Sequence, residues 1–218
     1  PYISTGLRQS KFGIAWDQAL DAYCEAAGLP GLKVVGVDCH IGSQITELSP
    51  FLAALDRLLL LIGRIEAVGI ELEHIDLGGG LGIRYDTEDP PARAAMMAAV
   101  LNRLDADPIG RRLEVMFEFG RSLVGNAGLL LTRVEHLKDN SGHGFAIVDA
   151  AMNDLLRPAL YDAWHTVSPL RATAAAHARP GPWDLVGPVC ESGDWLAHGR
   201  ELTLAEDDLL AIQSAGAY

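Results

Sequence analysis

The sequence predicts an α/β fold over residues 1–124 and a separate, mainly β domain over residues 125–218. In the first part, short apolar runs alternate with segments of helical periodicity, and repeated βα units of this kind form a parallel sheet covered by helices. In the second part, two apolar runs are followed by segments rich in Gly and Pro. A chain of 218 residues, 49% of them hydrophobic, is long enough to bury one large core or two smaller ones.

The individual elements follow from apolar runs and from helix start and stop signals. A helix over residues 17–27 precedes a β-branched strand at residues 34–37. Ser49 is a candidate N-cap of the next helix, with Pro50 at its first position and Gly69 as its stop. The remaining expected elements are strands at 74–77, 113–117, 129–134 and 145–149 and a helix over about 91–104.

The charge and the cysteines of the chain exclude several classes of protein. Nucleic acids and anionic membranes select basic surfaces, whereas this chain has a formal net charge of −12, so we expect a small-molecule ligand instead. The longest aliphatic run, residues 58–62, is far too short to cross a bilayer. Cys24, Cys39 and Cys190 are odd in number and form no C-x-x-C pair, which favours a reducing compartment, the cytoplasm, over a disulfide or thiolate-zinc scaffold.

Each predicted strand of the first part ends in a polar or Gly-rich cluster. The three clusters are VGVDCHIGSQ, HIDLGGGLG and VMFEFGRS. In (β/α) barrels the carboxyl ends of the strands and the loops after them converge on one face, where sites are built. We therefore expect the three clusters to line one pocket.

The second cluster leaves two interpretations open. Residues 76–82, DLGGGLG, do not complete G-x-G-x-x-G because Ile83 stands in the place of the last glycine, so a dinucleotide site is not expected. The backbone N–H groups of this run can approach a phosphate closely, or the run is only a tight turn. A metal site at the Asp and His residues of the first two clusters is the weaker idea, because their spacing is not that of a recognised ligand set, and no metal is expected.

Other polar residues also have both a functional and an ordinary structural interpretation. Glu118 and Arg121 frame a glycine after a strand, where they could hold a cationic ring nitrogen and a phosphate or simply form a salt bridge. Arg157 and Tyr161 lie four residues apart, so they share one face of a short helix, either at a site or as a solvated charge beside a packed ring. In GPVCESGD, Cys190 is either a small buried residue or a functional thiol.

Seven stretches, in order and over nearly the whole chain, resemble the fold-type III pyridoxal-phosphate decarboxylases, the alanine racemase and ornithine decarboxylase-like family. The branch that acts on diaminopimelate is the most similar. The stretches are SKFGI, GVDCHIGSQ, DLGGGLGIRY, EFGRS, VDAAMNDLLRPALYDAWH, GPVCESGDWLA and the terminal AGAY. The resemblance implies the later part of a (β/α)8 (TIM) barrel over residues 1–124, followed by a β-rich domain that carries the Cys-Glu-Ser motif.

The resemblance also implies a pyridoxal 5'-phosphate site at the carboxyl end of the barrel. His40 would stack on the cofactor ring, and Glu118 would keep the pyridine nitrogen protonated, which makes the ring an electron sink. Tyr218 would reach the cofactor or the substrate. The other residues expected around the cofactor are Ser43, Gly79, Gly80, Gly120 and Arg121.

The substrate residues are implied in the same way. Arg121, Arg157 and Tyr161 would bind a substrate carboxylate, and Glu191 would bind the far amino group of meso-2,6-diaminopimelate. Cys190 would enter the site of the partner subunit in a homodimer with shared active sites, and would protonate the carbon left after carbon dioxide departs. A thiol suits this step because it can deliver a proton near neutral pH without being fully ionised. The implied reaction yields L-lysine and is the last step of lysine biosynthesis.

The chain departs from the family pattern at two places. Phe119 replaces the Pro of the usual Glu-Pro-Gly-Arg turn, so this turn loses a fixed φ. No stretch resembles the first barrel strand, which carries the family's Schiff-base lysine. We therefore expect these 218 residues to be a fragment that lacks the N-terminal part and the extreme C-terminus and is inactive alone. The alternatives are a related decarboxylase of ornithine, arginine or carboxynorspermidine, and a non-catalytic relative that binds the cofactor or a partner.

Overall fold

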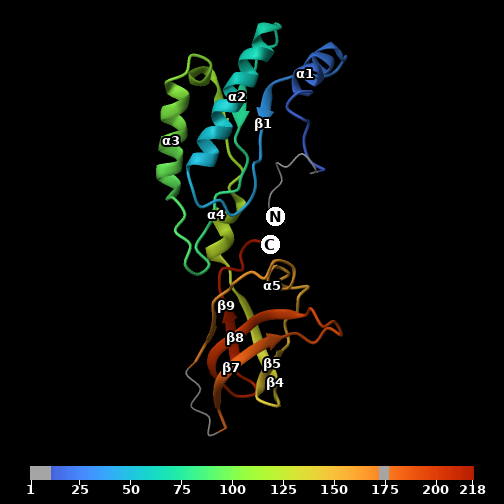
Figure 1. The fold of residues 1–218 in the computed structure, drawn as a ribbon, viewed down its shortest axis with the longest axis vertical. Coiled ribbons are helices and arrows are strands. Elements are labelled where there is room, and N and C mark those ends of the chain that lie inside the picture. Colours follow the sequence, from blue (N-terminus) through green and yellow to red (C-terminus); the bar gives the residue numbers. More distant parts are fainter. Residues whose placement is uncertain (1–10, 172–176) are drawn as a thin grey trace. The chain divides into compact units, whose positions relative to one another are not determined.

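The chain divides into two compact units in the computed structural model, which describes residues 11–171 and 177–218 (Figure 1). The first unit contains the described residues up to Ile83 together with Asp89–Ser122. The second unit contains Arg84–Glu88 and Leu123–Tyr218. Within the described ranges, no helix has both the length and the apolar character that crossing a membrane requires.

The first unit is built on a parallel sheet whose strands lie side by side in sequence order. Its strands are β1 (Gly36–Asp38), β2 (His74–Asp76) and β3 (Glu114–Met116). Its helices are α1 (Ala19–Gly28), α2 (Ser49–Ala67), α3 (Arg93–Asp105) and the short 3-10 helix η1 (Gly110–Arg112). Because α2 connects β1 to β2 and α3 connects β2 to β3, the chain runs through consecutive βα units, as in part of a barrel.

Helices α2 and α3 bury apolar stripes in the core of this unit. Phe51, Leu55 and Ile62 recur at helical spacing on α2 and are at most 2% exposed, as are Met96 on α3 and Ile75 on β2. All five belong to one cluster of buried residues. Since side chains alternate along a strand, the residues that flank Ile75, and their counterparts on β1, point to the opposite face of the sheet.

Several element boundaries differ from the sequence-based expectation, including the starts of α2 and β1. Ser49 is the first residue of α2 and not its N-cap, because Leu48 occupies the cap position. Strand β1 begins at Gly36, two residues after the predicted start at Val34. The carbonyl oxygen of Val35 nevertheless accepts hydrogen bonds from two backbone N–H groups at the start of β2, at 2.7 and 3.2 Å, so the pairing extends just outside the strand.

The second unit is built on a six-stranded sheet with the order β6-β9-β4-β5-β7-β8. All neighbours are antiparallel except β5 and β7. The strands are β4 (Leu130–Asn140), β5 (His143–Val148), β6 (Val167–Pro169), β7 (Arg179–Val186), β8 (Trp195–Leu204) and β9 (Leu209–Ile212). The chain enters this unit within α4 (Gly120–Val124), and the 3-10 helix η2 (Gly125–Ala127) and helix α5 (Arg157–Tyr161) complete it.

Candidate active site

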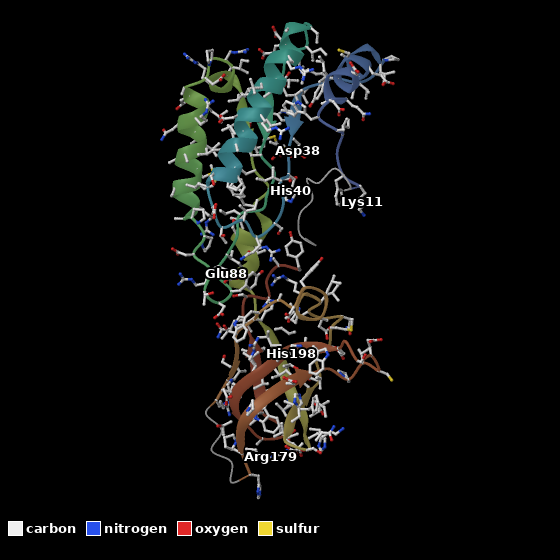
Figure 2. The ribbon with its side chains drawn as sticks, viewed as in Figure 1. Lys11, Asp38, His40, Glu88, Arg179 and His198 are labelled. Atoms are coloured by element: carbon white, nitrogen blue, oxygen red, sulfur yellow. The ribbon has the colours of Figure 1, made fainter. Side chains whose placement is uncertain are left out.

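Three carboxylates stand at the carboxyl ends of the three parallel strands. Asp38 and Asp76 are the last residues of β1 and β2 and pair in register, and Glu118 follows β3. One oxygen from each carboxylate lies within 4.8 Å of the others. Figure 2 shows Asp38 and His40 where the chain leaves β1. By strand alternation, Asp38 and Asp76 point to the face of the sheet opposite α2 and α3.

These carboxylates raise the cost of ionising their neighbours. Desolvation, followed by the negative charges of Asp76 and Glu118, raises the pKa of Asp38 above its ordinary value of 3.8. Desolvation and then the charge of Asp38 raise the pKa values of Tyr23 and Cys39. The strand ends therefore carry concentrated negative charge, which a protonated ring nitrogen or another cation would balance.

The loop after β1 and the glycine run after β2 hold each other in place. The backbone N–H of Gly79 donates to Nδ1 of His40 at 3.1 Å, so the proton of the neutral ring is on Nε2. A Cβ on Gly79 would lie 2.4 Å from the carbonyl oxygen of Glu118, and one on Gly80, whose φ is +97°, would lie 2.2 Å from that of Gly42. Close backbone approach therefore requires these glycines, and it fixes the orientation of the His40 ring.

A cation and a hydroxyl group meet at the start of α4. Arg121, 7% exposed, donates from Nη2 to Oγ of Ser43 at 3.0 Å. Gly120, the first residue of α4, has open space where a Cβ would stand, with no heavy atom within 4 Å. A guanidinium, a hydroxyl and uncovered backbone together form a suitable donor set for a phosphate group.

Phe119 occupies the position where the family pattern has Pro. Its ring stacks on that of Phe117, with the centroids 4.7 Å apart and the planes 28° apart, and it packs against the core of the first unit. The turn thus gains an aromatic contact in place of a fixed φ. Gly120 and Arg121 follow directly, and Arg121 still reaches Ser43.

In the second unit, the cysteine of GPVCESGD lies in the loop between β7 and β8, where Cys190 and Glu191 are both exposed. Asp194 anchors this loop and is 3% exposed. Its Oδ2 accepts the backbone N–H of Val189 at 2.9 Å, and its Oδ1 accepts that of Met152 at 2.6 Å. A buried carboxylate therefore ties both ends of the thiol loop to the segment before α5.

Arg157 and Tyr161 are the first and last residues of α5, so they do share a short helix, with Pro158 in its first turn. Tyr161 is 41% exposed, but Arg157 is 7% exposed and is not a solvated charge. Its Nη1 lies 2.9 Å from Nε2 of His165. Tyr218, the last residue, is 74% exposed.

The predicted site residues thus form one cluster in the first unit and a further set in the second. The structure brings together His40, Ser43, Gly79, Gly80, Glu118, Gly120 and Arg121. The second unit carries Arg157, Tyr161, Cys190, Glu191 and Tyr218. Sequence reasoning gave no role to Asp194 or His165, although Asp194 stands in the stretch that contains the cysteine. His165 is the last residue of VDAAMNDLLRPALYDAWH, but nothing in that stretch indicated that it contacts Arg157.

Comparisons with known proteins decide the family. Residues 1–125 match the family model described as "Pyridoxal-dependent decarboxylase, pyridoxal binding domain". The chain belongs to this family. It is also 60% identical over 218 residues to the diaminopimelate decarboxylase of Pseudomonas fluorescens and 58% identical to that of Pseudomonas aeruginosa. These matches cover 100% of this chain and 51% of each relative, so the chain spans about half the length of the curated relatives it matches.

A solved structure supports the same assignment. The crystal structure of diaminopimelate decarboxylase from Helicobacter pylori complexed with L-lysine has a TM-score of 0.88 and 38% sequence identity, covering 99% of this chain and 52% of that one. This confirms the predicted partial (β/α)8 barrel with a following β-rich part, and the family match confirms pyridoxal phosphate as the cofactor.

The strand-end residues fit this cofactor chemically. The Arg121 and Ser43 pair matches a phosphate, and the Glu118 carboxylate matches a protonated ring nitrogen. The flat, oriented ring of His40 matches stacking on an aromatic cofactor.

Proposed function

We propose that the chain is the part of a diaminopimelate decarboxylase that carries its later barrel strands and β-rich domain, and that the whole protein converts meso-2,6-diaminopimelate to L-lysine and carbon dioxide. The observation that carries the proposal is the group of side chains at the strand ends, where Arg121, Ser43, Glu118 and His40 lie in one cluster that suits pyridoxal phosphate. The identity of 60% to a relative of that name, over the whole chain, supports the choice of substrate.

When bound, pyridoxal phosphate supplies an electron-withdrawing ring that accepts the electron pair left when carbon dioxide departs. Glu118 holds the proton on the ring nitrogen, and its negative charge among neighbouring carboxylates favours the cationic ring. Arg121 and Ser43 would hold the phosphate, together with the backbone at Gly79, Gly80 and Gly120. His40 would hold one face of the cofactor ring, and Tyr218 would contact the cofactor or the substrate.

The substrate is held by its charged ends. Arg121, Arg157 and Tyr161 bind a substrate carboxylate, because a guanidinium offers a rigid pair of donors to the two oxygens. Glu191 binds the far amino group, so a substrate without that group leaves the carboxylate unpaired. Cys190 donates a proton from Sγ to the substrate carbon that has lost carbon dioxide, and the exposure of its loop allows the thiol to reach a partner subunit.

The proposal extends to assembly and location. The protein acts as a homodimer with shared active sites, in which Cys190 serves the site of the partner subunit. It works in the cytoplasm, where it catalyses the last step of lysine biosynthesis. The three cysteines are all free among the described residues, which is in keeping with a reducing compartment.

The test uses the full-length protein loaded with pyridoxal phosphate. We expect carbon dioxide and L-lysine from meso-2,6-diaminopimelate, with kcat/KM roughly 100-fold or more above that for ornithine, arginine or carboxynorspermidine. Preference for one of those substrates would replace the proposal with a related decarboxylase. Absence of turnover with every one of these substrates, with or without cofactor binding, would indicate a non-catalytic relative.

A cysteine pair provides the matched control. Cys190→Ala should lower kcat by roughly 100- to 10,000-fold, the range for loss of a proton donor, while the cofactor still binds. Cys24→Ala, at another exposed cysteine on α1, should leave kcat unchanged. Equal effects of the two substitutions would remove Cys190 from the mechanism.

A further inference from the structure

Arg157 is enclosed by aromatic side chains of the second unit. Its guanidinium carbon lies 4.2 Å from the centroid of the Tyr85 ring, in a cation–π contact. One of its nitrogens, Nη1, lies 2.9 Å from Nε2 of His165. The two rings also meet each other edge to face, with centroids 5.1 Å apart and planes at 73°. The orientation of the guanidinium is therefore restricted on two sides.

The partners of His165 fix its protonation. Its ring is fully buried, and Nδ1 lies 2.8 Å from the carbonyl oxygen of Gln213. A carbonyl oxygen only accepts hydrogen bonds, so Nδ1 carries the proton, and an arginine only donates, so Nε2 is the acceptor for Arg157. His165 is thus the neutral tautomer protonated at Nδ1, with both ring nitrogens engaged.

The backbone around His165 makes this geometry rigid. The N–H of Gln213 donates to the carbonyl oxygen of Thr166 at 2.8 Å, which joins the ends of β6 and β9. From β8, Nη2 of Arg200 donates to the carbonyl oxygen of His165 at 3.2 Å. His165 is therefore held through its ring and through its main chain.

A neutral acceptor has a different effect on arginine than a carboxylate has. A carboxylate partner orients a guanidinium but also neutralises it, whereas a neutral imidazole orients it and adds no negative charge. Among the described residues, Glu88 is an acidic group on which the charge of Arg157 acts. Desolvation raises the pKa of Glu88, but backbone N–H groups and then the charge of Arg157 bring it below its ordinary value. Glu88 itself accepts the backbone N–H groups of Tyr85 and Asp86, at 2.9 and 2.8 Å.

We propose that His165 is a positioning residue that fixes the orientation of the Arg157 guanidinium for a substrate carboxylate and, as a neutral ring, adds no negative charge of its own. This inference rests on the proposed function and deepens it, because it identifies the contact that orients the residue proposed to bind the substrate carboxylate. Tyr85 makes a second contact with the same guanidinium, through the face of its ring.

The first experiment compares substitutions at His165 in the full-length holoenzyme. His165→Leu keeps a similar volume but removes both hydrogen bonds, and it should raise KM for meso-2,6-diaminopimelate by roughly 10- to 100-fold with kcat changed only a few-fold. His165→Gln keeps an amide acceptor and an amide donor, so it should restore most of the affinity. His136→Leu, at an exposed histidine paired with Glu206, is the control and should leave KM unchanged.

Several outcomes would overturn the inference. These are an unchanged KM in His165→Leu, a loss confined to kcat, or a failure of His165→Gln to recover affinity. If the wild-type holoenzyme is active and KM does not respond, the inference fails while the proposed function stands. If the wild-type holoenzyme is inactive on meso-2,6-diaminopimelate, the proposed function fails.

A second measurement does not depend on activity or on a variant that folds. Nitrogen-15 chemical shifts of the His165 ring in the wild-type protein should identify Nδ1 as the protonated nitrogen and Nε2 as the hydrogen-bond acceptor at neutral pH. A ring protonated at Nε2, or at both nitrogens, would contradict the proposal, because Arg157 would then face a donor.

Discussion

Arg121 and Ser43 are joined by a hydrogen bond of 3.0 Å from Nη2 to Oγ, although they lie 78 positions apart in the sequence. The bond connects the loop after β1 to the first turn of α4. It places a buried cation next to a hydroxyl group, a combination that suits the binding of an anion.

This pair leads to a prediction about cofactor affinity. Ser43→Ala removes one donor to the phosphate and the support of Arg121, so the dissociation constant of pyridoxal phosphate should rise by roughly 10-fold, and Arg121→Lys should cost more because a point charge replaces a planar fork. Absorbance titration with the cofactor measures both. Arg111→Lys, at an exposed arginine of η1, is the control and should bind as the wild type does. Normal affinity in Arg121→Lys would disprove the phosphate role.

The glycine run yields a prediction about folding stability. Gly80 and Gly31 both have positive φ values, +97° and +83°, but a Cβ on Gly80 would meet a carbonyl oxygen at 2.2 Å whereas one on Gly31 would meet nothing within 4 Å. Gly31→Ala should therefore lower the free energy of unfolding by only about 1 kcal/mol, the cost of the backbone conformation. Gly80→Ala should lower it by about 4 kcal/mol or more, because the clash adds to that cost. Urea unfolding measures both free energies. Equal losses would mean that the backbone near Gly80 moves enough to accommodate a Cβ.

Asp38 gives a prediction about pH. Its pKa is raised from 3.8, chiefly by desolvation and then by Asp76 and Glu118, so the native state binds this proton more tightly than the unfolded chain does. The resulting stability is fully present below pH 3.8 and is lost as the pH rises through the higher native pKa. At pH 7 Asp38→Asn should therefore raise the urea midpoint, and the gain should disappear as the pH falls toward 3.8. Asp21→Asn on α1 is the control. A gain that is the same at all pH values would exclude this cause.

Asp194 gives a prediction about the thiol loop. Asp194→Asn leaves one amide oxygen for the two backbone N–H groups of Val189 and Met152, so one buried donor loses its acceptor. The free energy of unfolding should fall by about 2 kcal/mol. Hydrogen exchange at those two amides should also become faster. Glu201→Gln, on the exposed side of β8, should change neither quantity, and slow exchange in Asp194→Asn would show that other contacts hold the loop.

Much of the first unit could be predicted because its signals are local. Helix α2 shows helical periodicity over its full length, with Pro50 in its first turn. The polar clusters that converge at the strand ends follow from parallel βα topology, in which all strands finish at the same edge. The spacing of Arg157 and Tyr161 likewise predicted their common helix.

Other features depend on contacts that the sequence does not display. Strand β7 runs through a stretch rich in Pro, a residue that normally argues against a strand. The strand can form because Pro180 and Pro182 pair with β8 alone, on one side of β7. Pairing with the second neighbour, β5, begins at Trp183. The role of His165 was equally hidden, since it depends on which groups stand beside each ring nitrogen. Boundaries such as the start of α2 moved by one residue because capping there does not use the Ser49 side chain.

The assignment of Arg84–Glu88 to the second unit affects the order in which that unit can form. During synthesis this short peptide leaves the ribosome before any strand of the six-stranded sheet exists. Tyr85 therefore cannot reach its place beside Arg157 and His165 until much later parts of the chain have been made. A truncated polypeptide that starts at Leu123 would contain every strand of the second unit. It would still lack the Tyr85 ring, which contacts Arg157 and His165.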